Sequence, residues 1–307
     1  MIDDDSGRGR GSPTQSKKQL AVIYHRIMMS ETSRRGFLQS IPAAAAASAA
    51  AVPSPAGAAP AGAIRLGIAS YSFREFSRRL CIRYTKELGI SLLTIKEFHA
   101  LYRSTPEELD RARREFESAG LTLTGGGTVY MQKEDPDDVR FYFEYAKRLG
   151  LPMMNVGPTA KTLPIIERFA KEYDIKIAVH NHGPEDKHFP APSDALKIVK
   201  DMDPRMGVCI DVGHTTRTGK DVLEEIEKAG SRLLDMHIKD LRDLKQSRSQ
   251  CDVGDGQMPV PQIFRLLMKM NYAGVVHLEY EINAENPLPG MHRSFAYMRG
   301  VIAGIRS

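Results

Sequence analysis

Residues 206–240 of the sequence read MGVCIDVGHTTRTGKDVLEEIEKAGSRLLDMHIKD and decide the fold class. The short apolar run Met206–Val212 has the length and β-branched content of a buried strand. Apolar residues then recur at helical spacing over Val222–Ala229, and a second short apolar run follows at Leu233–Lys239. A strand, a helix and another strand in this order are typical of two parallel strands joined by a helical crossover.

The same alternation fills the chain from Ile64 onward. Helical segments lie between short apolar runs, and one of them spans Glu107–Ala119 after a typical helix start at Ser104-Thr105-Pro106. The predicted strands are Arg65–Ser72, Leu92–His99, Leu121–Thr128, Pro152–Gly157, Lys176–His182, Met206–Val212, Leu233–Lys239 and Gly274–Glu281. Eight strands alternating with helices predict an α/β fold, a single (β/α)8 barrel over residues 63–307.

An open, doubly wound sheet is the alternative fold for such a pattern. That fold predicts a glycine-rich phosphate turn after an early strand, and the sequence from Gly67 to Gly89 contains no G-x-G-x-x-G. The run Gly125-Gly126-Gly127 lacks the Lys and Ser/Thr of a phosphate loop, so we interpret it as close backbone packing. The barrel is therefore the favoured fold.

The composition of the 307 residues excludes several classes of protein. A chain with 42% hydrophobic and 26% charged residues is neither fibrous nor mostly disordered. Its three cysteines include no C-x-x-C pair and cannot build a disulfide framework. Residues 63–307 carry 36 basic and 34 acidic side chains, so this part of the chain is nearly neutral. We expect no nucleic acid partner, because nucleic-acid-binding domains carry clustered positive charge.

The first 62 residues resemble an export signal. Arg34 and Arg35 form an adjacent pair, a weakly apolar alanine-rich run follows at Phe37–Val52, and small residues such as Ala61-Gly62-Ala63 come next. The arginine pair resembles a twin-arginine signal, which implies the twin-arginine export machinery as a partner and a periplasmic or extracellular location. The alternative is a low-complexity tail with a chance arginine pair.

This interpretation divides the chain into a signal segment at residues 1–62 and a barrel domain at residues 63–307. The alanine-rich run is shorter and less apolar than the stretch of about 20 residues that crosses a bilayer, so we expect no stable membrane insertion. Export of a folded protein suits one that acquires a metal ion before it leaves the cytoplasm.

Ionisable side chains gather at the predicted carboxyl ends of the strands. In a (β/α)8 barrel these ends meet at one rim, where barrel enzymes build their active sites. Asn155, at the end of the fourth strand, is expected either to line the same pocket and contact substrate or to hold backbone groups. The strand-end residues are Glu97 and His99, His180 and His182, Asp211 and His214, His237 and Lys239, and His277, Glu279 and Glu281.

Four of these residues predict a metal site. His180, Asp211, His237 and Glu279 supply one imidazole or carboxylate each from four successive strands, at equivalent depth. Such a set suits a divalent transition ion, and we expect one Mn, Co, Zn or Fe ion to bind there. The alternative is a buried network in which two carboxylates pair with two imidazoles without an ion.

Five ordered motifs carry a family resemblance. They are Leu66–Phe73, Cys209–His214, His237–Asp240, Gly254-Asp255-Gly256 and Leu278–Glu281. Together they resemble the sugar isomerase/epimerase superfamily with a xylose-isomerase-like barrel, over essentially all of residues 64–307. The resemblance implies that Asp211, His237 and Glu279 bind the metal. It also implies that His214 and Lys239 contact substrate oxygens and that Glu97 reaches the site from strand two.

The resemblance further implies a metal-dependent enzyme that enolises a keto-sugar or polyol, a small carbohydrate. Its relatives are often dimers or tetramers, so a homo-oligomer is expected. In such chemistry the metal polarises a carbonyl and a base removes the neighbouring proton. The candidate bases are Glu279, Glu97 and His214, the candidate general acids are His182 and Lys239, and the expected substrate contacts are His182, His99, Asn155 and Glu281.

One position departs from the epimerases of this superfamily. They carry a glutamate on strand five where this sequence has His180, and that glutamate faces the one on strand eight across the substrate. With His180 the carboxylate pair is broken, so a symmetric epimerase mechanism is in question. Elimination from a keto-polyol, as in the inosose dehydratase branch, is the alternative, and a non-catalytic barrel that binds carbohydrate or metal is the third. A nuclease of the same fold is disfavoured by the nearly neutral charge.

Overall fold

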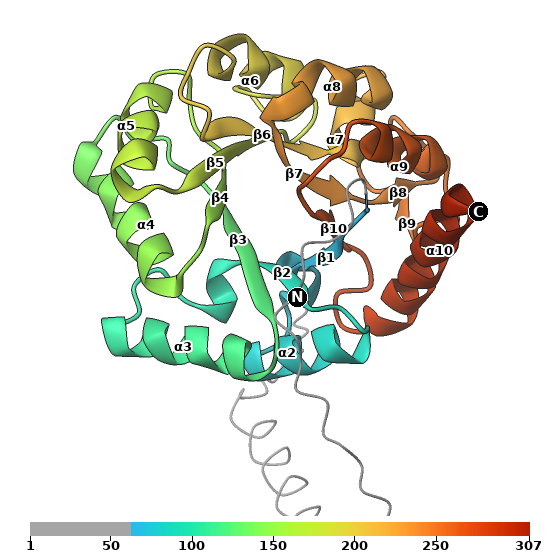
Figure 1. Ribbon diagram of the computed structural model, residues 1–307, viewed down its shortest axis with the longest axis horizontal. Coiled ribbons are helices and arrows are strands. Elements are labelled where there is room, and N and C mark those ends of the chain that lie inside the picture. The colour runs from blue at the N-terminus through green and yellow to red at the C-terminus, as the bar shows by residue number, and fades with distance from the viewer. Residues whose placement is uncertain (1–62) are drawn as a thin grey trace, which may run out of the picture. The chain divides into compact units, whose positions relative to one another are not determined.

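Eight parallel strands close into a barrel (Figure 1). The computed structural model describes residues 63–307. The strands are β1 (Leu66–Ala69), β2 (Leu92–Ile95), β3 (Thr122–Val129), β4 (Met153–Val156), β5 (Lys176–His180), β6 (Met206–Asp211), β7 (Leu233–Ile238) and β10 (Val276–Leu278). Successive strands are neighbours in the barrel, and β10 closes it against β1. The predicted (β/α)8 barrel is confirmed.

Helices form a ring around this barrel, as Figure 1 shows. Their ends follow local capping: at the start of α3, Thr105 Oγ1 accepts the Glu108 N–H while the Glu108 carboxylate accepts the Thr105 N–H. The last residue of α4 is followed by Gly150. The helices are α2 (Arg78–Glu87), α3 (Pro106–Ser118), α4 (Pro136–Leu149), α5 (Leu163–Tyr173), α6 (Pro192–Val199), α7 (Val212–Arg217), α8 (Val222–Ala229), α9 (Val260–Lys269) and α10 (Leu288–Arg306).

The chain differs from the predicted elements at the ends of several strands and in the segments around β7. The first two strands were predicted to reach Ser72 and His99, but they end earlier and continue as single helical turns, η1 (Ser70–Phe73) and η2 (Glu97–His99). A third turn, η3 (Gly230–Arg232), precedes β7. After β7 the chain adds a small antiparallel sheet of β8 (Asp240–Leu241) and β9 (Gln250–Cys251).

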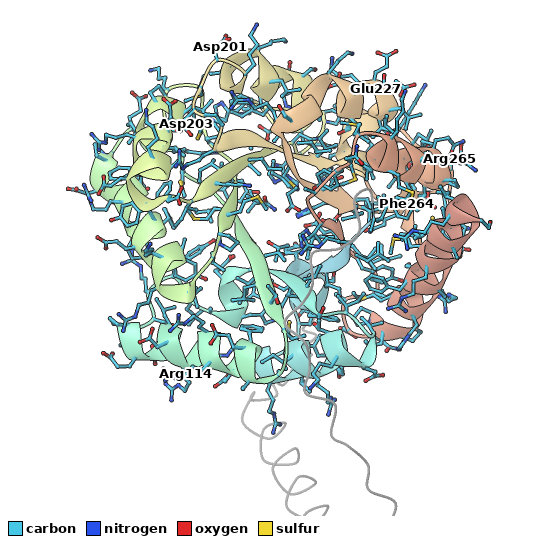
Figure 2. All side chains as sticks on the ribbon, viewed as in Figure 1. Arg114, Asp201, Asp203, Glu227, Phe264 and Arg265 are labelled. Carbon is cyan, nitrogen blue, oxygen red and sulfur yellow. The ribbon has the colours of Figure 1, made fainter. Side chains whose placement is uncertain are left out.

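An apolar layer between the strands and the helices holds the barrel together. Phe143, Phe169 and Phe264 are fully buried in it, and burying a side chain of this size contributes about 1.5–3 kcal/mol. Charged side chains on the outer helix faces, such as Arg114 and Glu227, point to solvent (Figure 2). Because the apolar packing lies between the strands and the helices, residues at the carboxyl ends of the strands can be polar without loss of this core.

Gly127 lets the backbones of β3 and β4 approach each other closely. A Cβ atom at this residue would lie 2.1 Å from the carbonyl oxygen of Asn155, and its φ of 121° favours glycine. The glycine run therefore serves close backbone packing, as the sequence predicted.

The predicted export signal and its boundary at residue 62 lie outside the described residues. Within residues 63–307, the structure contains no helix with the length and apolar character needed to cross a bilayer.

Candidate active site

Four side chains converge at the carboxyl end of the barrel. His180 ends β5, Asp211 ends β6, His237 lies on β7 and Glu279 directly follows β10. Their ligand-type atoms lie within 4.8 Å of one another, and all four side chains are buried. His237 Nδ1 lies 3.0 Å from His180 Nε2 and 3.2 Å from Glu279 Oε2. The structure thus brings together the four predicted metal ligands, which we call the quartet.

The quartet fits a divalent cation. Ligands about 2.1 Å from a metal lie about 3.0–4.2 Å from one another, and Asp211 Oδ2 lies 4.0 Å from His180 Nε2. Within the described residues, Asp211 Oδ2 makes no hydrogen bond, although it forms an ion pair with Lys239. A buried carboxylate oxygen without a hydrogen bond is rare in native proteins and is available to a cation. Cys209 also lies within reach of the two histidines, but burial raises the pKa of its thiol to about 12, which disfavours the thiolate in the metal-free protein.

Asp211 is held in place by the start of α7. Its Oδ1 accepts the backbone N–H of His214 at 2.8 Å as the N-cap of that helix. Asn181 Oδ1 accepts the backbone N–H of Asp211 itself at 3.0 Å. One carboxylate oxygen is therefore committed to the cap, and the other, Oδ2, faces the quartet. The same helical turn places His214 Nε2 4.0 Å from Oδ2, and burial lowers the pKa of His214 to about 3, so its imidazole is neutral.

Lys239 lies among three carboxylates. Its Nζ is 2.9 Å from Asp211 Oδ2, 2.9 Å from Glu279 Oε2 and 2.6 Å from Glu281 Oε2. Burial alone would lower the pKa of Lys239, but these carboxylates outweigh it and hold the pKa well above its usual range. Burial likewise opposes ionisation of Glu279, and Lys239 and His237 outweigh it, so the pKa of Glu279 is well below its usual range. At Asp211 burial prevails and raises the pKa, a cost that a bound cation would offset.

A cavity of about 440 Å³ opens above the quartet. His180 and Glu279 form part of its floor, and His182, His214 and Glu281 line it as well. His182 stacks on the ring of Tyr130 at 5.7 Å between centroids, and its Nδ1 lies 3.3 Å from Asp186 Oδ2. The remaining lining residues are Ala69, Tyr71, Lys96, Gly127, Thr128 and Tyr130.

Glu97 and His99 are not among the residues that line this cavity, contrary to the sequence prediction. The turn η2 starts where the strand was predicted to continue, so the alternation of faces stops there. His99 is buried away from the cavity, with Nδ1 3.1 Å from Ser70 Oγ and Nε2 3.2 Å from Phe76 O. Glu97 pairs with its neighbour Lys96 at 3.1 Å. Strand two therefore contributes Lys96 to the cavity, a residue that the sequence analysis missed.

Asn155 and His277 lie beneath the quartet rather than at the rim. Asn155 is fully buried and donates to Asp235 Oδ2 at 2.7 Å, so it does not line the cavity as predicted. His277 Nδ1 lies 2.7 Å from Asp235 Oδ1, inside the barrel. Asp235 was also missed, although it lies two residues before His237 and so shares its face of β7.

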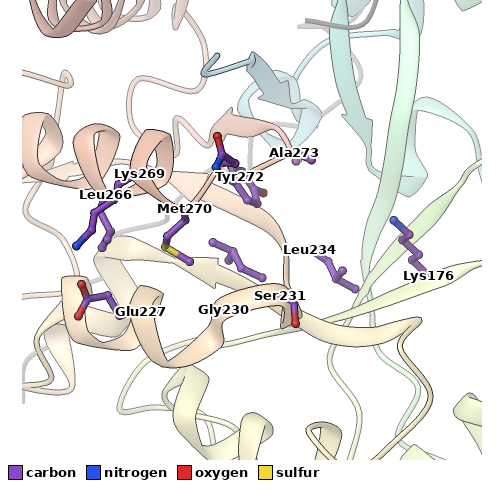
Figure 3. A pocket seen from close by; sticks show the side chains of 13 residues that line it. Lys176, Glu227, Gly230, Ser231, Leu234, Leu266, Lys269, Met270, Tyr272 and Ala273 are labelled. Atoms are coloured by element: carbon purple, nitrogen blue, oxygen red, sulfur yellow. The ribbon is translucent and has the colours of Figure 1, made fainter. Parts of the chain in front are cut away.

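A larger cavity, of about 690 Å³, lies at the opposite end of the barrel (Figure 3). Lys176 and Leu233, the first residues of β5 and β7, are part of its lining. Its lining holds one carboxylate, Glu227, and no imidazole among the described residues. The clustered imidazoles and carboxylates lie instead at the carboxyl ends of the strands, the end at which barrel enzymes build their active sites, so the smaller cavity is the candidate site.

Similar proteins include two enzymes and one solved structure. An inosose dehydratase of Mesomycoplasma hyopneumoniae (strain 7448) is 25% identical over 155 residues, which are 44% of this chain and 51% of that protein. A 3-oxo-isoapionate decarboxylase of Pectobacterium atrosepticum is 26% identical over 218 residues, 62% of this chain and 76% of that protein. The chain thus spans about half the length of the dehydratase. The crystal structure of the IOLI protein with a zinc atom matches this chain with a TM-score of 0.66 at 15% identity, over 78% of this chain and 99% of that chain. At this low identity, the likeness supports the fold alone.

A family match agrees with this fold. Residues 82–300, more than half of the chain, match the family described as Xylose isomerase-like TIM barrel. The matched region contains the whole quartet and every barrel strand except β1. The chain therefore belongs to the xylose isomerase-like TIM barrel family.

Proposed function

We propose that this protein is a metal-dependent enzyme that enolises a keto-polyol and then eliminates water from it. The observation that carries the proposal is the quartet, two of whose members, His180 and Glu279, line a cavity with further ionisable side chains. Its donors, two imidazoles and two carboxylates, are the ligand types of catalytic Zn²⁺, Mn²⁺, Co²⁺ or Fe²⁺ sites. The zinc atom named with the IOLI structure is consistent with this choice.

In this proposal His180, Asp211, His237 and Glu279 hold the cation. When bound, it would polarise the substrate carbonyl and so lower the pKa of the adjacent C–H bond. The ionised Glu279 faces the cavity and accepts that proton. Lys239, which stays charged between its carboxylates, keeps Glu279 in its ionised form. Lys239 is not among the residues that line the cavity, contrary to the sequence prediction, so we do not assign it a substrate contact.

His182 completes the elimination. Asp186 accepts from its Nδ1 and so directs its Nε2 side toward Tyr130 and the cavity. The protonated form of His182 carries a second proton, on Nε2, and gives it to the departing hydroxyl group, while Glu279 takes the proton from carbon, so the products are an unsaturated ketone and water. Glu97 does not line the cavity, so we no longer assign it as a base.

Elimination fits the site better than epimerisation. Burial, together with His182 and His237, holds the pKa of His180 well below its usual range, so its side chain is a neutral imidazole. A carboxylate pair acting on opposite faces of the substrate is therefore absent from strands β5 and β10. The two similar enzymes also carry the names of a dehydratase and a decarboxylase.

The test is proton exchange in deuterated water. Metal-loaded protein is incubated with a panel of inososes and keto-sugars, and deuterium uptake and alkene signals are followed by NMR. Elimination predicts an enone product, whereas epimerisation predicts a deuterated diastereomer. Glu279→Gln is expected to lower the rate about 1000-fold, and Glu224→Gln, on the exposed side of α8, leaves it unchanged. Sugar binding without exchange in the metal-loaded wild type would instead support the non-catalytic binding protein.

A further inference from the structure

Arg217, the last residue of α7, lies next to the cavity residue His214. The two side chains are three residues apart and therefore lie on the same face of the helix. Arg217 does not line the cavity itself, and its side chain is only 5% exposed. Because a guanidinium group stays charged, burial to this extent requires polar partners that hold it.

The first of these partners is the imidazole of His214. Arg217 Nη1 lies 3.1 Å from His214 Nδ1. An arginine side chain has N–H donors and no acceptor, so His214 Nδ1 is the acceptor of this hydrogen bond and carries no proton. The proton of the imidazole is therefore on Nε2. This nitrogen lies on the side of the quartet, 4.0 Å from Asp211 Oδ2, and His214 lines the cavity.

The loop after β5 holds the guanidinium group in this orientation. Arg217 Nη2 pairs with Glu185 Oε1. Gly183 brings the loop against the same group, since a Cβ atom there would lie 3.2 Å from Arg217 Nη1 and its φ of 83° favours glycine. The loop has its own internal support, because Asp186 Oδ1 accepts the backbone N–H of His188 at 2.8 Å. It is therefore a support for Arg217 rather than a segment that depends on it.

We propose that Arg217 is a positioning residue that holds His214 as a hydrogen-bond donor, with its Nε2–H directed into the cavity. Glu185 acts through Arg217 by fixing the guanidinium group. With its proton on Nε2, His214 presents no lone pair to the cavity, so it is not the base that removes the proton from carbon. Its place in the reaction is to donate to the substrate oxygen that gains negative charge. This role rests on the proposed function.

The variant Arg217→Met removes the donors and keeps the apolar part of the side chain. We expect kcat and kcat/KM to fall together, about 10- to 100-fold, on the inosose or keto-sugar that the wild type converts. The reason is that a hydrogen bond to a charged group is lost and the donor matters most as the oxygen gains charge. Arg205→Met is the control. Arg205 also pairs with two acidic side chains, Asp174 and Asp203, but it precedes β6 at the opposite end of the barrel, so activity should equal that of the wild type.

A double-mutant cycle separates positioning of His214 from a general structural role. His214→Phe keeps a ring at this position and removes both nitrogens. If Arg217 acts through His214, adding Arg217→Met to His214→Phe should leave kcat/KM unchanged within about twofold. If Arg217 only supports the fold, the two losses should multiply.

NMR of ¹⁵N-histidine-labelled, metal-free protein measures the tautomer without substrate or metal. In the wild type we expect a protonated Nε2 and an unprotonated Nδ1 on His214. In Arg217→Met both tautomers of His214 should be present, because no donor occupies the lone pair of Nδ1. Glu185→Ala, at a side chain that is 62% exposed, should produce the same change to a smaller extent.

The outcomes separate the inference from the proposed function. A wild type that converts none of the sugars would overturn the proposed function, and NMR would still decide whether Arg217 sets the tautomer of His214. A protonated Nδ1 in the wild type, or losses that multiply in the cycle, would overturn the inference alone. If Arg217→Met does not fold, the wild type and Glu185→Ala carry the NMR test, and identical tautomer populations in the two would overturn the inference.

Discussion

Lys239 Nζ lies 2.9 Å from Glu279 Oε2, so an ammonium group shares a carboxylate with the proposed metal site. The same ammonium contacts Asp211 and Glu281. In their ordinary ionised forms, three carboxylates and one ammonium leave two negative charges. A divalent cation balances that charge. The positively charged Lys239 and a metal ion can therefore occupy one site, because the three carboxylates compensate both.

Lys239→Met is therefore expected to destabilise the metal-free protein. Removing one member of a buried charge network typically costs about 3–5 kcal/mol, because the remaining charges lose their partner. Added Zn²⁺ or Mn²⁺ should recover a large part of this loss, since the cation supplies the missing positive charge. Urea unfolding with and without metal measures both values.

The control for this variant is Lys228→Met. Lys228 also pairs with two glutamates, Glu224 and Glu225, but its side chain is 54% exposed. Its replacement should leave the response to metal equal to that of the wild type. An equal metal response in Lys239→Met and Lys228→Met would contradict the charge argument.

Asp240 links two motifs that the sequence shows separately, the H-x-K-D of β7 and the later G-D-G. Its Oδ2 accepts the N–H groups of Gly254 and Gly256 at 2.9 and 3.1 Å, and its Oδ1 accepts that of Met258 at 2.9 Å. A Cβ atom at Gly256 would lie 2.2 Å from Asp240 Oδ1. Asp240 thus holds the loop after β9 rather than contacting substrate.

Asp240→Asn should loosen that loop without unfolding the barrel. The new amide N–H₂ cannot accept from Gly254 and Gly256, so two hydrogen bonds are lost, at a cost of about 0.5–1.5 kcal/mol each, because water can reach both glycines. Hydrogen exchange should rise at both amides and remain unchanged in β5 and β6. Unchanged protection at Gly254 and Gly256 would show that the loop is held by other contacts.

The sequence predicted the barrel and the quartet for the same reason. Side chains alternate between the two faces of a strand. Once each strand is recognised, the sequence therefore indicates that Asp211, His237 and Glu279 point inward. The prediction failed at Glu97, because the short turn η2 replaces the end of a strand and no alternation continues through it. Only the structure shows that Lys96, rather than Glu97, lines the cavity.

The support beneath the quartet was not predictable for a different reason. Asp235 receives hydrogen bonds from Asn155, 80 residues earlier, and from His277, 42 residues later. Such pairings depend on the depth of each residue inside the barrel. That depth is set by strand register, including the irregularity between Val208 and Cys209 that shifts β6 against β7.

We propose that the protein is exported through its arginine pair. Replacing both Arg34 and Arg35 by lysine should retain the protein in the cytoplasm, because the twin-arginine pathway recognises the pair itself. Cell fractionation with an antibody to the barrel measures the distribution. The control replaces Lys17 and Lys18, an earlier basic pair, by arginine. Equal export of both variants would indicate that residues 1–62 are a tail and not a signal of this type.

His99 should make the stability of the protein depend on pH. Burial lowers the pKa of His99 to about 4 from an ordinary value of 6.5, because its imidazole is enclosed between Ser70 and Phe76. Between these two pH values the unfolded chain binds a proton that the folded chain does not. The stability that the neutral, buried His99 contributes is therefore complete above pH 6.5 and is lost as the pH falls. The total loss of stability is about 3 kcal/mol once the pH is below 4.

Urea unfolding of the metal-free protein at pH 7, 6 and 5 checks this dependence. His99→Gln should be less stable than the wild type at pH 7, since it loses a well-packed ring, but its stability should fall less steeply with acid. By pH 5 the wild type should have lost about 2 kcal/mol through His99. His292→Gln, at a residue whose side chain is 48% exposed, should follow the wild-type curve. Parallel curves for His99→Gln and the wild type would mean that the pKa of His99 is the same in the folded and the unfolded protein.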